Sequence, residues 1–346
     1  MESYITFCYE NANRLNLTLM NSLLSYWPAA PLCPAGICRG TGAMPDQRRV
    51  ITSEHVVYHF HPAMEPKWRV RPGEALEIRC PDGVNGRIRS EQDRLVEVDP
   101  DRINDAVGPI FVEGAEPGDR LVFDIDDIQV PQDWGYILIL PTFGLQQRKV
   151  AAARTTIVAI RDRMVQFAGS SIPLDPCIGT IGVAPAEGRY STLIPFDHGG
   201  NMDTTAIRAG ARVHFPVNQP GALLALGDPK AVMGDGEVCG TGVGVPINVF
   251  ARIELIKGGR RPRPVIETAG EWQFLASAET VEEACRLAND DLITALCEAR
   301  GLSWEEGYML SSLVGHLRIS QVVDPLMTVR MAVAKEYLPT LGKPAP

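Results

Sequence analysis

The chain has 346 residues, of which 45% are hydrophobic and 22% are charged. This composition supplies enough apolar sequence for a sizeable core and predicts one large domain or two to three ordinary ones. The formal net charge is −9, with 33 Lys and Arg against 42 Asp and Glu, and no large basic cluster occurs. We therefore expect no nucleic-acid surface, and a small neutral or cationic partner fits better.

The cysteine and apolar patterns favour a cytoplasmic protein. The 8 cysteines form no CxxC pair and lack the dense spacing of a disulfide scaffold. No apolar run approaches the roughly 20 residues that span a bilayer, and the N-terminus lacks the pattern of a secretory signal. We predict reduced thiols, no membrane association and a cytoplasmic location.

Residues 1–43 differ from the rest of the chain because they combine Cys8, Cys33 and Cys38 with a Pro/Gly-punctuated tail. We interpret this segment as a non-native or disordered extension. A targeting segment or a Cys33/Cys38 redox pair is the alternative.

Residues 44–260 are predicted to form a β-rich catalytic region. Glycines and prolines separate short apolar stretches, which is typical of short strands joined by tight turns. The expected strands include residues 56–61, 75–80, 120–130, 135–141, 211–217, 221–226 and 247–256. In 120–130 the alternation of Leu121, Phe123 and Ile125 predicts a sheet with one wet face. No βαβ rhythm is visible, which disfavours a doubly wound parallel sheet.

Residues 261–346 are predicted to form a smaller α+β region, joined to the first by the basic, proline-rich stretch 257–264. One helix is expected from Thr280, a capping residue followed by acids, to Arg300-Gly301, a basic residue and a glycine stop. A second helix is expected to start near Ser303.

Five segments with acidic or histidine side chains have turn-like sequences: 81–83, 112–119, 196–203, 227–230 and 234–237. A plain turn is an adequate explanation for Glu116–Asp119. The stretch Asp197–Asp203 is harder to explain in this way, because it places His198, Asn201 and two carboxylates beside Gly199 and Gly200. Glycines let a backbone approach a ligand closely, and Asp, His and Asn supply metal-ligating or acid–base atoms.

The stretch VMGDGEVCGTG, residues 232–242, has the same character. Asp235 and Glu237 stand at i and i+2, so in an extended backbone they would share a face. Two close carboxylates repel each other, which raises the pKa of one and makes it a usable general base or acid. Cys239 follows as either a nucleophile or a buried thiol.

The order of these motifs resembles the acetamidase/formamidase family from about residue 53 to 335. The similar segments are GPIFVEGAEPGD (108–119), DPCIGTIGVAP (175–185), HGGNMD (198–203), LGD (226–228), MGDGEVCGTG (233–242) and LRISQVVDP (317–325). The resemblance implies a mainly β fold with jelly-roll-like sandwich and barrel parts and a smaller α+β C-terminal region. It also implies a homo-oligomer, such as a dimer, that hydrolyses short aliphatic amides such as formamide or acetamide to a carboxylate and ammonia.

The resemblance places the family's site positions on Asp82, His198, Asn201, Asp203, Asp228, Asp235 and Glu237. Combining these with the residues chosen from their chemistry, we predict Glu237, Asp235, His198 and Lys230 as catalytic residues. The predicted substrate-binding residues are Asn201, Gly199 and Gly200. A divalent cation, zinc or calcium, is the candidate cofactor, with Asp82, His198, Asp203, Asp228 and Asp235 as its ligands. No P-loop or GxGxxG motif occurs, so we expect no nucleotide or flavin.

Two positions depart from the family pattern. Lys230 stands where members usually carry a histidine, and Gly244 stands where they usually carry a glutamate. A metal held by those side chains would lose a ligand. A charged lysine cannot coordinate a metal, although its ammonium could replace the metal's charge beside Asp235 and Glu237.

The leading hypothesis is hydrolysis of a small amide. Glu237 or Asp235 would activate water, a divalent cation or Lys230 would stabilise the oxyanion, and His198 or an acid would protonate the leaving ammonia. The alternative is a catalytically weakened family member that binds a small amide or a metal.

Overall fold

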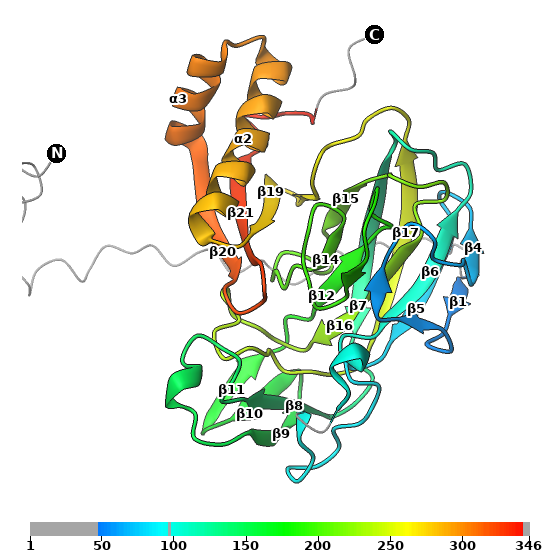
Figure 1. Cartoon of the computed structure of the whole chain (residues 1–346), viewed down its shortest axis with the longest axis vertical. Coiled ribbons are helices and arrows are strands. Elements are labelled where there is room, and N and C mark those ends of the chain that lie inside the picture. Colours follow the sequence, from blue (N-terminus) through cyan, green and yellow to red (C-terminus); the bar gives the residue numbers. More distant parts are fainter. Residues whose placement is uncertain (1–47, 96–97, 342–346) are drawn as a thin grey trace, which may run out of the picture. The chain divides into compact units, whose positions relative to one another are not determined.

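The computed structural model describes residues 48–95 and 98–341, so the predicted extension 1–43 lies outside the described residues. The described chain is mainly β, with curled sheets and two helices toward the C-terminus (Figure 1). The predicted fold class is confirmed.

The largest sheet in the described residues has nine strands. In order across the sheet they are β1 (Arg49–Ile51), β5 (Ala75–Cys80), β17 (Ile247–Ile256), β7 (Arg120–Gln129), β15 (Arg212–Pro216), β18 (Val265–Glu267), β19 (Glu271–Ala278), β21 (Met327–Ala334) and β20 (Gly315–Gln321). Strand β15 pairs directly with β18. The sheet therefore runs across the boundary predicted at residue 260.

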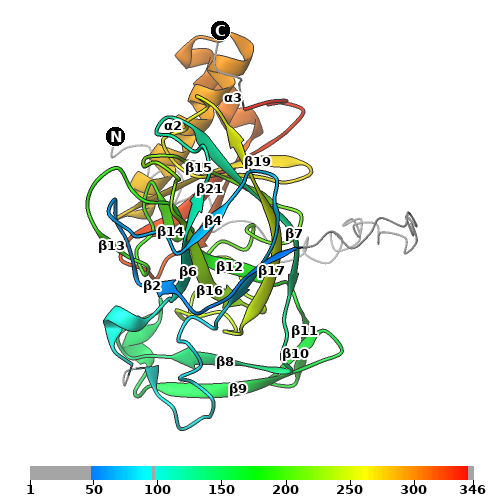
Figure 2. The same ribbon diagram turned by 90° about the vertical axis from the view of Figure 1, so that its right-hand side faces the viewer.

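Three smaller sheets accompany it in the described part of the chain. The first contains β14 (Gly199–Asn201), β12 (Cys177–Gly182), β16 (Leu224–Lys230), β6 (Ala106–Val112) and β2 (Val56–Val57), with β4 (Trp68–Val70) also paired to β6. The second contains β11 (Ser170–Pro173), β10 (Met164–Phe167), β9 (Arg154–Arg161) and β8 (Trp134–Ile139), and Figure 2 shows β8 and β9 side by side. The third pairs β3 (His59–Phe60) with β13 (Tyr190–Ser191).

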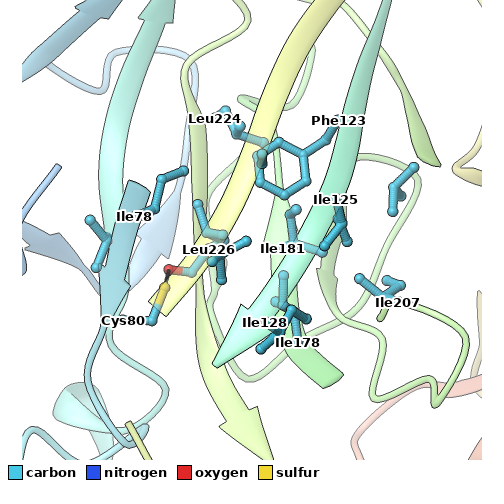
Figure 3. Packing of buried hydrophobic residues seen from close by; sticks show 14 of the residues in the cluster. Ile78, Cys80, Phe123, Ile125, Ile128, Ile178, Ile181, Ile207, Leu224 and Leu226 are labelled. Atoms are coloured by element: carbon cyan, nitrogen blue, oxygen red, sulfur yellow. Dashed lines mark hydrogen bonds between the residues drawn. The ribbon is translucent and has the colours of Figure 1, made fainter. Parts of the chain in front are cut away.

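The main core joins the nine-stranded sheet to the sheet of β12, β16 and β6. Phe123 and Ile125 of β7 pack in one cluster with Ile181 of β12 and Leu224 of β16 (Figure 3). Burial of such side chains contributes about 1.5–3 kcal/mol each. This core holds β16, and with it several charged side chains, in a fixed position.

Two of the predicted strands differ from the structure in an informative way. The first half of β7 is buried on both faces. On its second face the guanidinium of Arg120 donates to the carbonyl of Leu341 at 3.5 Å. The strand expected at 221–226 begins at Leu224 instead and extends to Lys230. Positive φ angles at Ala222 and Leu223 turn the backbone before it. The stretch 227–230 is consequently part of a buried strand, and its interpretation as a turn was wrong.

Both predicted helices are confirmed. Helix α2 (Val281–Arg300) begins where Thr280 Oγ1 accepts from the Glu283 amide at 3.2 Å and ends at Gly301 with φ of 64°. Helix α3 (Trp304–Val314) begins with a capping box at Ser303. The apolar side of α2 packs on β19 and β21. Neither helix in the described residues combines the length and apolar character that a bilayer span requires.

A set of large apolar side chains on α3 and β20 remains exposed, and β20 is an edge strand of the nine-stranded sheet in the described residues. We call this set the α3/β20 surface. Its members are Trp304, Tyr308, Met309, Leu313, Leu317 and Ile319.

Candidate active site

A cavity of about 350 Å³ has a strongly polar end. Strand β16 brings Asp228 and Lys230 to it, and the segment at the end of β14 brings Asn201 and Asp203. The loop after β16 supplies Glu237. A further carboxyl group, that of Asp324, comes from the turn between β20 and β21. Groups separated by more than 100 positions in the chain therefore meet at one place.

Lys230 lies at the centre of this polar end. Its Nζ is 2.5 Å from Asp228 Oδ2, 3.5 Å from Asp203 Oδ1 and 3.6 Å from Glu237 Oε1. Burial alone would lower the pKa of Lys230, but the three carboxyl groups outweigh it and hold the pKa well above its ordinary value. The ammonium therefore remains protonated and serves as a fixed positive charge.

The neighbouring acids have pKa values shifted upward to different extents. Burial raises the pKa of Asp203 to about 6, against the opposing effect of Lys230. Burial, reinforced by Asp203, raises the pKa of Glu237 well above its ordinary value. Burial also raises the pKa of Asp324 strongly. The cluster therefore combines the positive charge of Lys230 with buried acids whose pKa values lie above their ordinary range, a combination suited to acid–base chemistry.

The backbone at these carboxylates is held in an unfavourable conformation. Asp203, Asp228 and Glu237 have φ angles of 37°, 49° and 44°, in the left-handed region that non-glycine residues rarely adopt. Such residues cost about 1–3 kcal/mol each and tend to occur at functional sites. Gly179 of β12 makes room for two of them, because a Cβ there would lie 2.4 Å from Asp203 Oδ1 and 2.8 Å from Asp228 Oδ2.

A hydrogen-bond network fixes the side-chain amide of Asn201. Its Oδ1 accepts from Thr180 Oγ1 at 2.6 Å and from Asn104 Nδ2 at 2.8 Å. Its Nδ2 donates to Asp324 Oδ2 at 2.9 Å. Asn104 and Asp324 were missed as site residues from the sequence. Asp324 lies within the closing motif 317–325, so its carboxyl group could have been selected there, whereas Asn104 carries no such signal.

Asp203 has unused hydrogen-bonding capacity. Its side chain is fully buried and lines the cavity, and its closest polar neighbours are the Lys230 ammonium, 3.5 Å from Oδ1, and the Glu237 carboxyl group. Neither contact has the geometry of a strong hydrogen bond. A bound molecule with an N–H or O–H group could therefore add a hydrogen bond to Asp203.

His198 does not join this cluster. Its ring packs against Phe60 and Tyr190, each with a centroid distance of 5.0 Å, and it does not line the cavity. Neither ring nitrogen has a hydrogen-bond partner in the described part of the chain. Burial lowers the pKa of His198 to about 3, so the ring is neutral. The structure therefore does not bring His198 into the cavity lining with Asp203.

Gly199 and Gly200 serve packing rather than ligand approach. They form β14 against β12. A Cβ at Gly199 would lie 2.3 Å from the Ile181 carbonyl oxygen, and one at Gly200 would lie 2.3 Å from the Ile194 carbonyl oxygen. The interpretation that these glycines face a ligand is not supported, because the chain's own backbone occupies that space.

Asp235 and Glu237 diverge, although the sequence predicted a shared face. Positive φ angles at Gly236 and Glu237 turn the backbone between them. The Glu237 side chain is buried, whereas that of Asp235 is 46% exposed and pairs with Arg330 at 2.5 Å. The expectation that Lys230 lies beside both acids therefore holds for Glu237 and fails for Asp235.

Asp82 borders the cavity without entering it. Its Oδ1 accepts from the backbone amides of Gly86 at 2.8 Å and Val84 at 3.3 Å, so the carboxylate stabilises its own turn. Burial raises its pKa. Its carbonyl oxygen accepts from the Tyr136 hydroxyl at 2.6 Å.

Tyr136 explains the glycine at position 244. A Cβ on Gly244 would lie 2.5 Å from Tyr136 Cζ, so the tyrosine ring occupies the space that a larger side chain would need. Gly244 also bridges to Lys230 by backbone pairing. The two departures from the family pattern are therefore spatial neighbours, and a glutamate at 244 would displace the ring.

The predicted metal ligands are not assembled. Within residues 48–95 and 98–341, no three His, Cys, Asp or Glu side chains are arranged to hold a metal ion. Asp203 and Asp228 lie together, but the Lys230 ammonium stands between them and Glu237. His198 and Asp235 lie elsewhere.

Comparisons with known proteins agree with this arrangement of motifs. The chain is 26% identical to the formamidase of Methylophilus methylotrophus over 81% of this chain and 88% of that protein. It is 27% identical to a putative formamidase of Schizosaccharomyces pombe over 58% of this chain, and it spans 64% of the length of that relative. The crystal structure of a predicted acetamidase/formamidase from Thermoanaerobacter tengcongensis superposes with a TM-score of 0.81 at 40% identity. That match covers 84% of this chain and 96% of the other.

Residues 45–192 and 186–339 match the sequence model of the Acetamidase/Formamidase family. These two segments together extend over most of the chain and include every residue of the polar end of the cavity. The chain therefore belongs to the acetamidase/formamidase family.

Proposed function

We propose that this protein hydrolyses the C–N bond of a primary amide, giving a carboxylate and ammonia. The observation that carries the proposal is the buried Lys230 ammonium, which faces Asp203 and Glu237 at the polar end of a cavity. Relatives that are named formamidase and acetamidase support the same reaction class. The chain spans 64% of the length of the putative formamidase of Schizosaccharomyces pombe.

Lys230 is suited to polarise the amide carbonyl. Its Nζ makes one short contact, to Asp228 at 2.5 Å, while Asp203 and Glu237 lie at 3.5 Å and 3.6 Å. Because Lys230 lines the cavity and its contacts with Asp203 and Glu237 are long, an N–H of the ammonium can turn from one of these acids to a substrate oxygen. In a site shielded from water, such a fixed charge stabilises the oxyanion of the tetrahedral intermediate strongly.

Asp203 and Glu237 are suited to move the protons. Ionised Asp203 accepts a proton from water as the water oxygen bonds to the carbonyl carbon. Protonated Glu237 delivers a proton to the nitrogen as the C–N bond breaks and ammonia leaves. The upward shifts of both pKa values support the use of these two buried acids in proton transfer. Asn201, fixed by Asn104 and Thr180, supports the position of Asp324 beside them.

The residues present do not fit a divalent cation at this position. Carboxylates that would bind a cation already surround the Lys230 ammonium, and a second positive charge within a few ångströms would be repelled. We therefore derive no step through a metal, and Lys230 supplies the positive charge of the site.

Ammonia release from purified protein tests the proposal. With a panel of primary amides, the parent chain should release ammonia, and Glu237→Gln should lower kcat by about 10²–10⁴-fold because it removes a proton donor without changing the side-chain shape. Parent-level activity in Glu237→Gln would remove Glu237 from the reaction. Amide binding without turnover in the parent would favour the alternative, a binding protein on the same scaffold.

We also propose that the chain forms a homo-oligomer through the α3/β20 surface. Leu313 is 81% exposed and Met309 61% exposed, next to the edge strand β20. Clustered exposed apolar side chains mark interaction sites, and an edge strand can pair with its own copy. Light scattering should show Leu313→Asp with a lower mass than the parent. Leu145→Asp, which changes an equally apolar residue that is 57% exposed away from this surface, should keep the parent mass.

A further inference from the structure

The cavity is lined by two chemically different sets of side chains. Besides the polar end, the lining contains an apolar wall: Val84, Leu138, Leu140, Phe143, Leu193 and Ile103. Val84, Leu138 and Leu140 are buried and belong to one hydrophobic cluster with Tyr136, which holds them in place. Leu193, Ile103 and Phe143 are half-buried. A molecule in the cavity would therefore meet both the charged groups around Lys230 and a hydrocarbon wall.

The volume of the cavity exceeds what the smallest amides need. At about 350 Å³, it would hold roughly ten water molecules at about 30 Å³ each. Formamide and acetamide contain only a few non-hydrogen atoms, so either would leave most of the apolar wall facing water. Pockets that enclose larger organic ligands start at about 300 Å³. The apolar wall therefore has the room to bind something more than a methyl group.

The acidic side chains of the cavity lining disfavour a negatively charged group on the substrate. Four carboxyl groups, those of Asp203, Asp228, Glu237 and Asp324, share a single lysine in the cavity lining. An anionic substituent would be repelled by the ionised members of this set and would find no cation among the apolar side chains. A neutral hydrocarbon group suits the wall.

We propose that the preferred substrate is a neutral primary amide with an extended apolar acyl group, whose amide lies at Lys230 and whose chain lies along Leu138, Leu140 and Phe143. This inference rests on the proposed amide hydrolysis and specifies the substrate class for the same site. Each methylene placed on the wall adds about 0.8 kcal/mol of favourable burial, which corresponds to roughly a fourfold gain in kcat/KM.

A chain-length series tests this inference on the full-length protein. Ammonia release is measured for formamide, acetamide, butanamide, hexanamide and phenylacetamide, and hexanamide is expected to exceed acetamide in kcat/KM on the order of 100-fold. Succinamate, which carries a carboxylate on a chain as long as that of butanamide, should be at least tenfold poorer than butanamide. A maximum at formamide or acetamide, falling with chain length, would overturn the inference and leave the proposed hydrolysis intact.

A second readout keeps the two proposals separable. If no amide is hydrolysed by folded protein, the proposed function fails, and calorimetric binding then decides the substrate-class inference. Tighter binding of hexanamide than of acetamide supports it, and equal or weaker binding overturns it.

Substitutions in the apolar wall test whether the acyl chain of the substrate lies there. Phe143→Ala should reduce the hexanamide-to-acetamide ratio of kcat/KM by about tenfold, because a half-buried ring at the wall is lost. Leu193→Ala serves the same purpose if the first variant does not fold. Leu145→Ala, which changes an exposed residue outside the cavity lining, should keep the parent ratio. An unchanged ratio in both wall variants would contradict the assigned position of the acyl chain.

Discussion

Lys230 and His198 are both buried ionisable side chains that the sequence predicted to be catalytic, but their surroundings are opposite. Lys230 is 5% exposed and has carboxyl groups at 2.5 to 3.6 Å. His198 is 1% exposed and contacts aromatic rings. Burial by itself acts to lower the pKa of both side chains. The pKa of His198 is lowered, whereas the carboxyl groups around Lys230 outweigh the effect of burial and raise its pKa. Whether a buried ionisable side chain is charged, and can therefore act in catalysis, depends on its neighbours as well as on its residue type.

The largest effect is expected from removing the charge of Lys230. Lys230→Met leaves several buried carboxyl groups without a cation, so the unfolding free energy should fall by about 3–5 kcal/mol at neutral pH. Amide hydrolysis should fall by about 10³-fold, because the fixed charge at the oxyanion is lost. Denaturant unfolding and ammonia release measure the two effects. Parent-like stability in this variant would show that Lys230 is not the cation that balances the cluster.

The acid side of the pH profile should report the carboxylates around Lys230. As pH falls through about 6, Asp203 takes up a proton and can no longer accept one from water. kcat/KM should therefore drop below this pH by up to tenfold per pH unit. A profile that stays flat down to pH 4.5 would contradict an ionised Asp203 as the base.

Replacing His198 should have the smallest effect. His198→Phe exchanges a neutral ring whose nitrogens have no partner among the described residues for an apolar ring of similar shape. The unfolding free energy should stay within about 1 kcal/mol of the parent, and kcat/KM should change by less than a factor of about ten. A loss of a hundredfold or more in a folded variant would restore His198 to the catalytic site.

Local rules allowed much of the fold to be predicted. The capping residues Thr280 and Ser303 located both helices, because caps satisfy amides within a few residues. The strand 75–80 was predicted with the bounds of β5. In contrast, the start of β16 could not be predicted. It depends on positive φ angles at Ala222 and Leu223, and neither residue is a glycine that would have indicated such a turn.

The site was predicted less completely, because it depends on contacts between distant segments. Lys230, Asp203, Asp228 and Glu237 were all predicted as site residues, but their spacing could not show that the loop turns Asp235 away from them. Asn104 reaches Asn201 from 97 positions earlier in the chain, and only the packing of β12, β14 and β16 brings the two together. The glycines of HGGNMD suggested a ligand, whereas the structure shows close backbone packing.

The central claim is that the acids around Lys230 in the cavity carry out the hydrolysis, and an Asp→Asn substitution at Asp203 and at Asp235 tests it most directly. Asp203 is buried in the cavity and Asp235 is half exposed outside it. Asp203→Asn and Asp235→Asn each remove one negative charge with little change in shape, and ammonia release from one good amide substrate measures both. The account predicts a loss of at least about 100-fold for Asp203→Asn and less than about tenfold for Asp235→Asn. The reverse order, with both variants folded, would contradict it.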